Sequence, residues 1–306
     1  MVAQKQALTL LLAFSFIFKS SLADNGAGIP VYWGQDTREG SLRDACNSPN
    51  YNHVILSCLN AFGCGRNPAW NFAAHCSPSN YCNNLEQEIQ YCQKVKSIKV
   101  LLSNGGAIGD YSLCSPQDAQ NFADYLYHNF LSGQYGRLGN VVLDGIDFHI
   151  EDPRSNLYYD DLAQAIKAYS TIDRKIYVAA SPRCPFPDRY LDAAIRTGHF
   201  DYIYVQFYDN PSCEYFAGNT ANLFRSRDSW TSSVQPSNTV FLGLPANLGA
   251  SLGCGYIPPN ELINTFLPYV KKASNYGGVA LSNRYWDIQT NPSYSDQIKP
   301  YISKSA

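Results

Sequence analysis

The sequence predicts a single α/β domain with the architecture of a (β/α)8 TIM barrel. Three observations lead to this prediction. Eight short apolar runs typical of buried strands recur along the chain, amphipathic segments lie between most of them, and no linker interrupts the alternation. Strands that alternate with helices favour parallel pairing through right-handed crossovers, and eight such units close into a barrel.

The predicted elements follow one another along the whole chain. The strand-like runs are 29–33, 51–59, 100–103, 146–151, 176–181, 202–207, 240–244 and 279–282. The clearest amphipathic segments, which we expect to be helices, are 85–95, 116–130, 160–171 and 259–272. In such barrels the carboxyl ends of the strands form the functional face, so polar residues at those ends are the candidates for chemistry.

The first 23 residues predict a secretory signal peptide. A polar start is followed by an apolar stretch at 7–18, and small residues precede a cleavage site after Ala23. The expected mature domain is therefore 24–306. The apolar stretch is too short to span a bilayer, and no later segment reaches the required length. We expect a protein secreted to the extracellular space or the vacuole.

Composition excludes several classes of partner. The net charge is -2, without a basic run or an acidic tail, so neither nucleic acid nor a membrane surface is an expected partner. The chain contains 23 tyrosines and 4 tryptophans, which suit stacking on sugar rings, although most of them will serve ordinary packing. No cofactor is expected.

Ten cysteines in an exported chain favour disulfides over metal ligation, because the compartment is oxidising. Cys76 and Cys82 lie close enough in sequence to close one loop. The neighbouring His75 raises the alternative of a metal site formed with these two cysteines, but a disulfide is the better interpretation. Spacing alone does not fix the remaining pairs, and we expect no metal.

The most informative segment is 143–153, which reads L-D-G-I-D-F-H-I-E-D-P. In an extended strand side chains alternate between faces, so Asp147, His149 and Glu151 share one side. Carboxylates on a buried strand indicate either a reactive cavity or an ion pair that lines the barrel. The strand-like runs that would face Glu151 contain no Arg or Lys, which favours the reactive cavity.

The run from Asp144 to Glu151 resembles the D-G-x-D-x-D-x-E signature of glycoside hydrolase family 18. The resemblance extends along the mature chain to the plant class III chitinases of hevamine type. It is carried further by segment 29–35, which is similar to their first strand, by 184–190, which is similar to the loop after their fifth strand, and by 205–211, which is similar to their sixth strand and its exit.

This resemblance implies three disulfides, which join Cys46 to Cys92, Cys76 to Cys82 and Cys184 to Cys213. The family pattern does not supply the other four cysteines. Cys64 and Cys114 follow the second and third strands, which are neighbours at the barrel mouth, so their pairing is a further hypothesis. Cys58 and Cys254 remain unassigned.

The family cleaves β-1,4-linked N-acetylglucosamine polymers with the acetamido oxygen of the substrate as the nucleophile, an exception to the common scheme with two carboxylates. By resemblance Glu151 matches the acid that protonates the leaving oxygen, which requires it to be protonated near neutral pH. Asp147 matches the residue that orients the acetamido group and stabilises the developing positive charge. Tyr208 matches a tyrosine that assists at the same group.

Two positions depart from the family pattern. His149 replaces the aspartate nearest the acid, and Ser282 replaces the tryptophan of the eighth strand that forms the floor of the sugar subsite. The loss of one electrostatic stabiliser typically costs a factor of ~10² to 10³ in rate. Loss of the indole would weaken positioning as well. As an alternative, Trp286 could fold back to replace the missing ring, but a position in the loop after the eighth strand is the expectation.

The resemblance therefore favours a secreted chitinase-like lectin, which binds N-acetylglucosamine or chito-oligosaccharides with little or no hydrolysis. By match to the family's substrate contacts, the expected groove residues are Tyr32, Gln35, Asn71, Ala107, Ile108, Glu151, Gln206 and Tyr208. If the deep subsite is filled by His149 or collapsed around Ser282, shallow surface aromatics would bind the sugar instead.

Three other functions stay open. The chain could be an endochitinase of low turnover in plant defence, with Glu151 as its acid. It could instead inhibit a foreign glycosidase, because related inactive barrels resemble xylanase inhibitors. A seed storage role is also compatible with the sequence.

Overall fold

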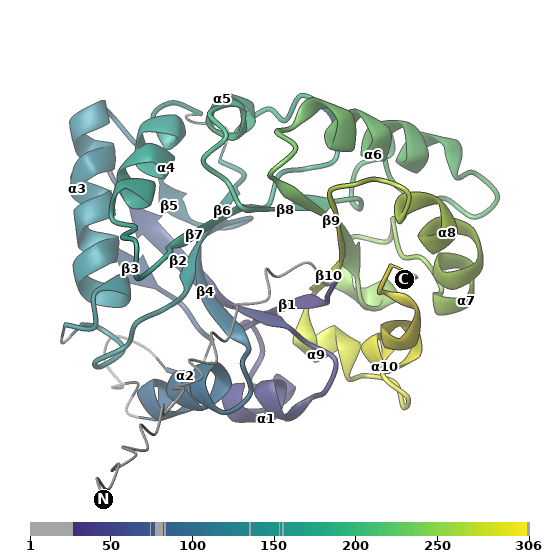
Figure 1. Ribbon diagram of the computed structural model, residues 1–306, viewed down its shortest axis with the longest axis horizontal. Helices are drawn as coiled ribbons and strands as arrows, with labels where there is room; N and C mark the ends of the chain where they lie inside the picture. Colours follow the sequence, from purple (N-terminus) through teal and green to yellow (C-terminus); the bar gives the residue numbers. More distant parts are fainter. Residues whose placement is uncertain are drawn as a thin grey trace, which may run out of the picture.

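Eight parallel strands form a closed barrel, and helices surround it as an outer ring (Figure 1). The computed structural model describes residues 27–304 except 74, 77–81, 83, 135, 153 and 155, so the predicted signal peptide lies outside the described residues. The strand order is β1-β10-β9-β8-β7-β6-β4-β2, and β1 pairs with β2 to close the ring. Among the described residues no helix is long and apolar enough to cross a membrane.

All eight predicted strand runs overlap strands of the barrel, so the predicted fold class is confirmed. The barrel strands are β1 (Pro30–Trp33), β2 (His53–Phe62), β4 (Lys99–Gly106), β6 (Gly145–Ile150), β7 (Tyr177–Ala180), β8 (Tyr202–Gln206), β9 (Thr239–Pro245) and β10 (Tyr276–Ser282). Two short strands at the mouth also pair with β2. They are β3 (Ala69–Trp70), which is antiparallel to it, and β5 (Asp110–Tyr111), which is parallel.

The helices alternate with these strands. They are α1 (Leu42–Asn47), α2 (Leu85–Lys94), α3 (Pro116–Leu126), α4 (Tyr159–Ala168), α5 (Asp192–Arg196), α6 (Ala221–Ser233), α7 (Pro259–Glu261), α8 (Leu267–Val270), α9 (Arg284–Asp287) and α10 (Tyr294–Ile298). The predicted helix 116–130 ends in a π-helical turn at Tyr127–Leu131. The predicted helix 259–272 is divided by a second such turn at Leu262–Phe266.

Helix α3 begins where its sequence predicts. The Ser115 side chain accepts a hydrogen bond from the backbone N–H of Asp118, and Pro116 occupies the first helical position. A serine cap satisfies one of the donors that every helix start leaves free, and proline is favoured at the first position because it has no N–H to satisfy. This cap fixes the point at which the chain leaves the barrel mouth after β5.

The apolar core has two parts. A small cluster inside the barrel includes Leu101, Ala179, Tyr204, Phe241 and Ala280. A larger cluster fills the layer between the strands and the helices. Apolar inward side chains thus fill the barrel up to the level of Asp147, which is in register with Ala179, and His149 and Glu151 follow further along the chain.

All four predicted disulfides form, and they join Cys46 to Cys92, Cys64 to Cys114, Cys76 to Cys82 and Cys184 to Cys213. Because Cys76 and Cys82 form a disulfide, they are not available as ligands for the alternative metal site with His75. The Nε2 atom of His75 instead lies 3.3 Å from a carboxylate oxygen of Glu39. Cys58 and Cys254 are the free cysteines among the described residues.

Candidate functional site

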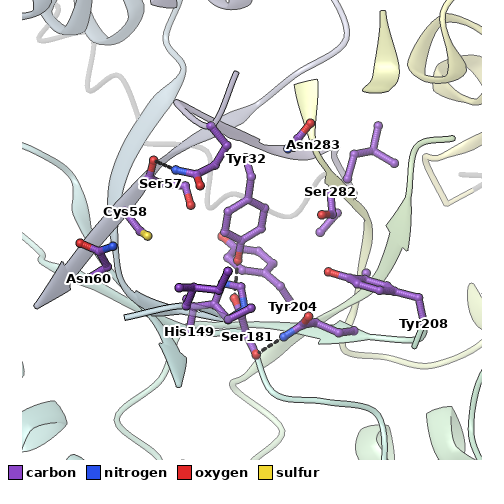
Figure 2. A pocket seen from close by; sticks show the side chains of 18 of the residues that line it. Tyr32, Ser57, Cys58, Asn60, His149, Ser181, Tyr204, Tyr208, Ser282 and Asn283 are labelled. Carbon is purple, nitrogen blue, oxygen red and sulfur yellow. Dashed lines mark hydrogen bonds between the residues drawn. The ribbon is translucent and has the colours of Figure 1, made fainter. Parts of the chain in front are cut away.

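A pocket of about 370 Å³ opens at the carboxyl ends of the barrel strands (Figure 2). Seven of the eight residues predicted for the groove line it, and these are Tyr32, Gln35, Asn71, Ala107, Ile108, Gln206 and Tyr208. His149 and Ser282 line it as well, so the deep subsite is neither filled nor collapsed. Two carboxylates of the acidic run, Asp147 and Glu151, are not among its lining residues.

Asp147 is enclosed by three hydroxyl groups below the pocket. Its Oδ2 accepts from Ser103 at 2.8 Å and from Tyr32 at 3.1 Å, and its Oδ1 accepts from Ser181 at 2.7 Å. Strand register explains the contact with Ser103, which lies directly opposite Asp147 on β4. Burial raises the pKa of Asp147, although His149 and the three hydroxyls act in the opposite direction. This carboxyl group is therefore engaged within the barrel rather than presented to a ligand.

Glu151 follows β6 directly, and its carboxylate has three partners. His149 places Nε2 3.0 Å from Oε1, Gln206 donates to the same oxygen at 3.0 Å, and Arg183 donates to Oε2 at 2.5 Å. Burial alone raises the pKa of Glu151, but the hydrogen bonds and charges of His149 and Arg183 outweigh it and lower the pKa well below its usual range. The side chain is only 6% exposed. Glu151 is therefore a covered carboxylate whose surroundings favour its ionised form.

Arg183 corrects the expectation that no basic residue faces Glu151. That expectation considered only the strand-like runs. Arg183 lies three residues beyond the end of β7, and its backbone forms an isolated β-bridge with Gln206 at the end of β8. Its guanidinium reaches the same level of the barrel as Glu151. A basic residue just beyond the carboxyl end of a strand was the signal that could have predicted this ion pair.

Of Asp147, His149 and Glu151, it is His149 that lines the pocket, with its imidazole ring (Figure 2). Burial lowers its pKa, but the hydrogen bond and charge of Glu151 outweigh burial and raise the pKa of His149 above its usual value. A carboxylate only accepts hydrogen bonds, so the proton of this contact lies on Nε2. The other ring nitrogen, Nδ1, is buried and has no hydrogen-bond partner among the described residues.

The opposite wall of the pocket is formed around Ser282. Its hydroxyl group hydrogen-bonds with that of Tyr208, whose pKa is raised by burial. Trp286 does not replace the missing ring, because it lies in α9 and is not among the residues that line the pocket. Its indole packs so closely on Gly249 that a Cβ there would lie 2.5 Å from the ring. The expected position of Trp286 beyond the eighth strand is confirmed.

The third wall is set by backbone contacts at the ends of β1 and β2. Gln35 donates from Nε2 to the carbonyl oxygen of Ser57 at 2.5 Å and to that of Asn71 at 3.2 Å. The Asn71 side chain in turn accepts from the backbone N–H of Ala73 at 2.9 Å. Ile108 lies at the rim and is 87% exposed. Amide, hydroxyl and aromatic groups thus surround the opening, as is typical of sites for neutral polar ligands.

This geometry has a clear chemical consequence. A general acid must carry a proton near the pH of its reaction and must reach the leaving group. In this structure the Glu151 side chain is 6% exposed, and the hydrogen bonds and charges of His149 and Arg183 lower the pKa of Glu151, which favours its ionised form. These contacts oppose the protonated state that the family mechanism requires of Glu151.

Comparison with known proteins gives the family. The sequence profile of glycosyl hydrolases family 18 matches residues 29–296. An acidic endochitinase of Cicer arietinum is 49% identical over 292 residues, which cover 94% of this chain and 96% of the relative.

Two solved structures are also similar to the whole barrel. Tamarind chitinase-like lectin has a TM-score of 0.79 and 42% identity, with coverage of 90% of this chain and 100% of that one. The xylanase-alpha-amylase inhibitor protein XAIP-I, in complex with trehalose, has a TM-score of 0.82 and 39% identity, with coverage of 89% and 97%. With its closed barrel and the acidic run at the end of β6, this chain belongs to glycosyl hydrolase family 18.

Proposed function

We propose that this protein binds N-acetylglucosamine-containing oligosaccharides, chitin among them, and hydrolyses them little or not at all. The observation that carries this proposal is the Glu151 carboxylate, which is held ionised between His149 and Arg183. The pocket beside it is open and bordered by hydrogen-bonding and aromatic side chains. The similarity to a tamarind chitinase-like lectin supports the same reading.

Binding without cleavage also follows from the second departure at this site. A serine at position 282 leaves no indole against which a sugar ring could be held and distorted, so a bound sugar would be positioned less strictly. The side-chain amides of Gln35 and Asn71, which line the pocket, would still offer hydrogen bonds to hydroxyl and acetamido groups. Weak or moderate affinity and very slow chemistry are the expected combination.

The test measures binding and cleavage of chitotetraose in the same samples of wild type and Glu151→Gln. The substitution keeps the shape of the side chain and removes its negative charge. We expect calorimetry to show binding by both proteins and chromatography to show no cleavage by either one above a buffer control. Hydrolysis by wild type that disappears in Glu151→Gln would instead establish a slow endochitinase and refute the proposal.

Similarity to an endochitinase and to a glycosidase inhibitor favours two other functions, and each of them is tested by a separate assay. The endochitinase of Cicer arietinum makes slow hydrolysis the second candidate, which the same assay tests. The xylanase-alpha-amylase inhibitor makes inhibition of a foreign glycosidase the third. Submicromolar inhibition of a xylanase or an amylase, without retention on a chitin column, would support inhibition over sugar binding.

The site of action is also a proposal. The apolar stretch before Ala23 supports export from the cytoplasm, and four disulfides suit an oxidising compartment. Amino-terminal sequencing of the protein purified from its source tests this directly. A mature chain that starts at Asp24 is expected, and a chain that retains Met1 would contradict it.

A further inference from the structure

The deep end of the pocket is bounded by three small residues on two neighbouring strands. Gly243 on β9 lies opposite Ala280 on β10, and Ser282 follows two residues later on the same inward face. A Cβ at Gly243 would lie 2.5 Å from the carbonyl oxygen of Val205, so the neighbouring strand excludes any side chain there. These residues leave a hollow, which we define by Gly243, Ala280, Ser282 and the tyrosines described next.

Tyr32, Tyr204 and Tyr208 stand around the same space (Figure 2). Their hydroxyl groups already have partners within the protein. Tyr32 hydrogen-bonds with Asp147 and Ser181, Tyr204 lies 3.1 Å from Nδ1 of His53, and Tyr208 hydrogen-bonds with Ser282. Each of these hydroxyl groups thus has a partner within the protein, and the tyrosine rings supply apolar surface to the hollow.

The amide group of Gln206 is bound on the side away from the hollow. Gln206 lies opposite Gly243 in register, yet its Nε2 donates to the Ser181 carbonyl oxygen at 2.8 Å and to Glu151 at 3.0 Å. Gln206 is thereby directed toward β7 and β6. An aromatic ring in the hollow would gain contacts with the tyrosine rings, whereas a sugar hydroxyl would have to share the hydroxyl groups of Ser282 and Tyr208, which already hydrogen-bond with each other.

From this arrangement we infer that the hollow takes a planar aromatic group, carried as the aryl substituent of a glycoside whose sugar lies at the mouth of the pocket. The inference rests on the proposed function in placing the sugar near Gln35 and Asn71. The pocket, at about 370 Å³, falls within the range of roughly 300 to 1,000 Å³ for sites that enclose small molecules. Aryl glycosides are therefore expected to bind more tightly than alkyl glycosides of the same sugar.

Calorimetry with phenyl β-N-acetylglucosaminide, the methyl glycoside, free phenol and chitotriose tests the inference. We expect wild type and Ser282→Ala to bind the phenyl glycoside at least tenfold more tightly than the methyl glycoside. Ser282→Phe fills the hollow and should remove the difference. Ala280→Leu fills it from the same strand and serves if Ser282→Phe does not fold, as judged by thermal unfolding.

The outcomes separate this inference from the proposed function. If chitotriose binds but wild type shows no preference for the phenyl glycoside, or if a folded filled variant keeps the preference, the aromatic site is refuted and sugar binding stands. If wild type, but not the filled variants, binds phenol while no sugar binds, the hollow is confirmed as an aromatic site and the proposed function fails.

Discussion

Arg183 donates from Nη2 to Oε2 of Glu151 at 2.5 Å, from a loop position that the strand pattern does not include. This contact changes the role that the acidic run predicts for Glu151. Glu151 occupies the position that the family uses for its acid, but an arginine and a histidine hold it as an anion. Loss of hydrolysis would thus rest on three positions, namely His149, Arg183 and Ser282, rather than on the two departures that the sequence motif displays.

The ion pair between Arg183 and Glu151 should contribute modestly to stability. We expect Arg183→Gln to lower the free energy of unfolding by about 1 kcal/mol at pH 7, because a covered carboxylate loses a charged donor. The effect is limited because the Arg183 side chain is 41% exposed and solvent screens it. Denaturant unfolding measures the change. Arg189→Gln, on the same loop, is the matched control, and equal effects of the two variants would contradict a specific ion pair.

Recovery of hydrolysis should require all three positions. In His149→Asp with Ser282→Trp, Arg183 still faces Glu151, so we expect chitotetraose cleavage to remain close to background. Adding Arg183→Gln frees the carboxyl group to take up a proton and should raise the rate at least tenfold over the double variant, since one electrostatic contact is commonly worth a factor of ~10² to 10³. Product analysis by chromatography measures both. A fully active double variant would show that Arg183 does not restrain Glu151.

The contact between His149 and Glu151 predicts a pH-dependent contribution to stability. Folding lowers the pKa of Glu151. The ionised side chain therefore contributes to folding stability above the unfolded pKa of ~4.3, and this contribution is lost as the pH falls through the lower folded pKa. The pKa of His149 is raised, so its contribution is present below its unfolded pKa of ~6.5 and is lost as the pH rises through the folded pKa.

The stability difference between wild type and His149→Gln should therefore be largest between about pH 4.5 and 6.5. Thermal unfolding across pH 3 to 9 measures it, with exposed His128→Gln as the control. A difference that grows steadily toward alkaline pH would contradict the contact.

The disulfide between Cys64 and Cys114 should stabilise the mouth of the barrel. It closes a loop with a sequence separation of 50 residues, so replacing both cysteines with serine is expected to lower the free energy of unfolding by about 2 to 4 kcal/mol. The Asp118 carboxylate accepts from the backbone N–H groups of both cysteines and should keep the local conformation. Cys254→Ser, which removes no disulfide, is the control, and an equal loss in both variants would exclude a specific role for the bond.

The strands could be predicted because each is a short apolar run between turn residues, and burial in a closed barrel requires that pattern. Tyr32, Gln35 and Gln206 could be predicted from their match to the family's substrate contacts, and all three line the pocket. Arg183 was missed because it lies outside the strand-like runs, three residues beyond the end of β7, where only its position after a strand end indicates a contact with Glu151. The hollow beside Ser282 was missed for a related reason, since it depends on the register between Gly243 and Ala280.

The central claim, that Glu151 is held as an anion, is tested most directly by its own titration. Carbon-detected NMR of protein with labelled glutamate side chains, assigned by comparison with Glu151→Gln, follows this carboxyl group from pH 2 to 8. We predict that it stays ionised throughout pH 4 to 8, with a pKa below the usual value of ~4.3. A pKa at or above that value would show that His149 and Arg183 do not hold it, and would restore Glu151 as a candidate acid.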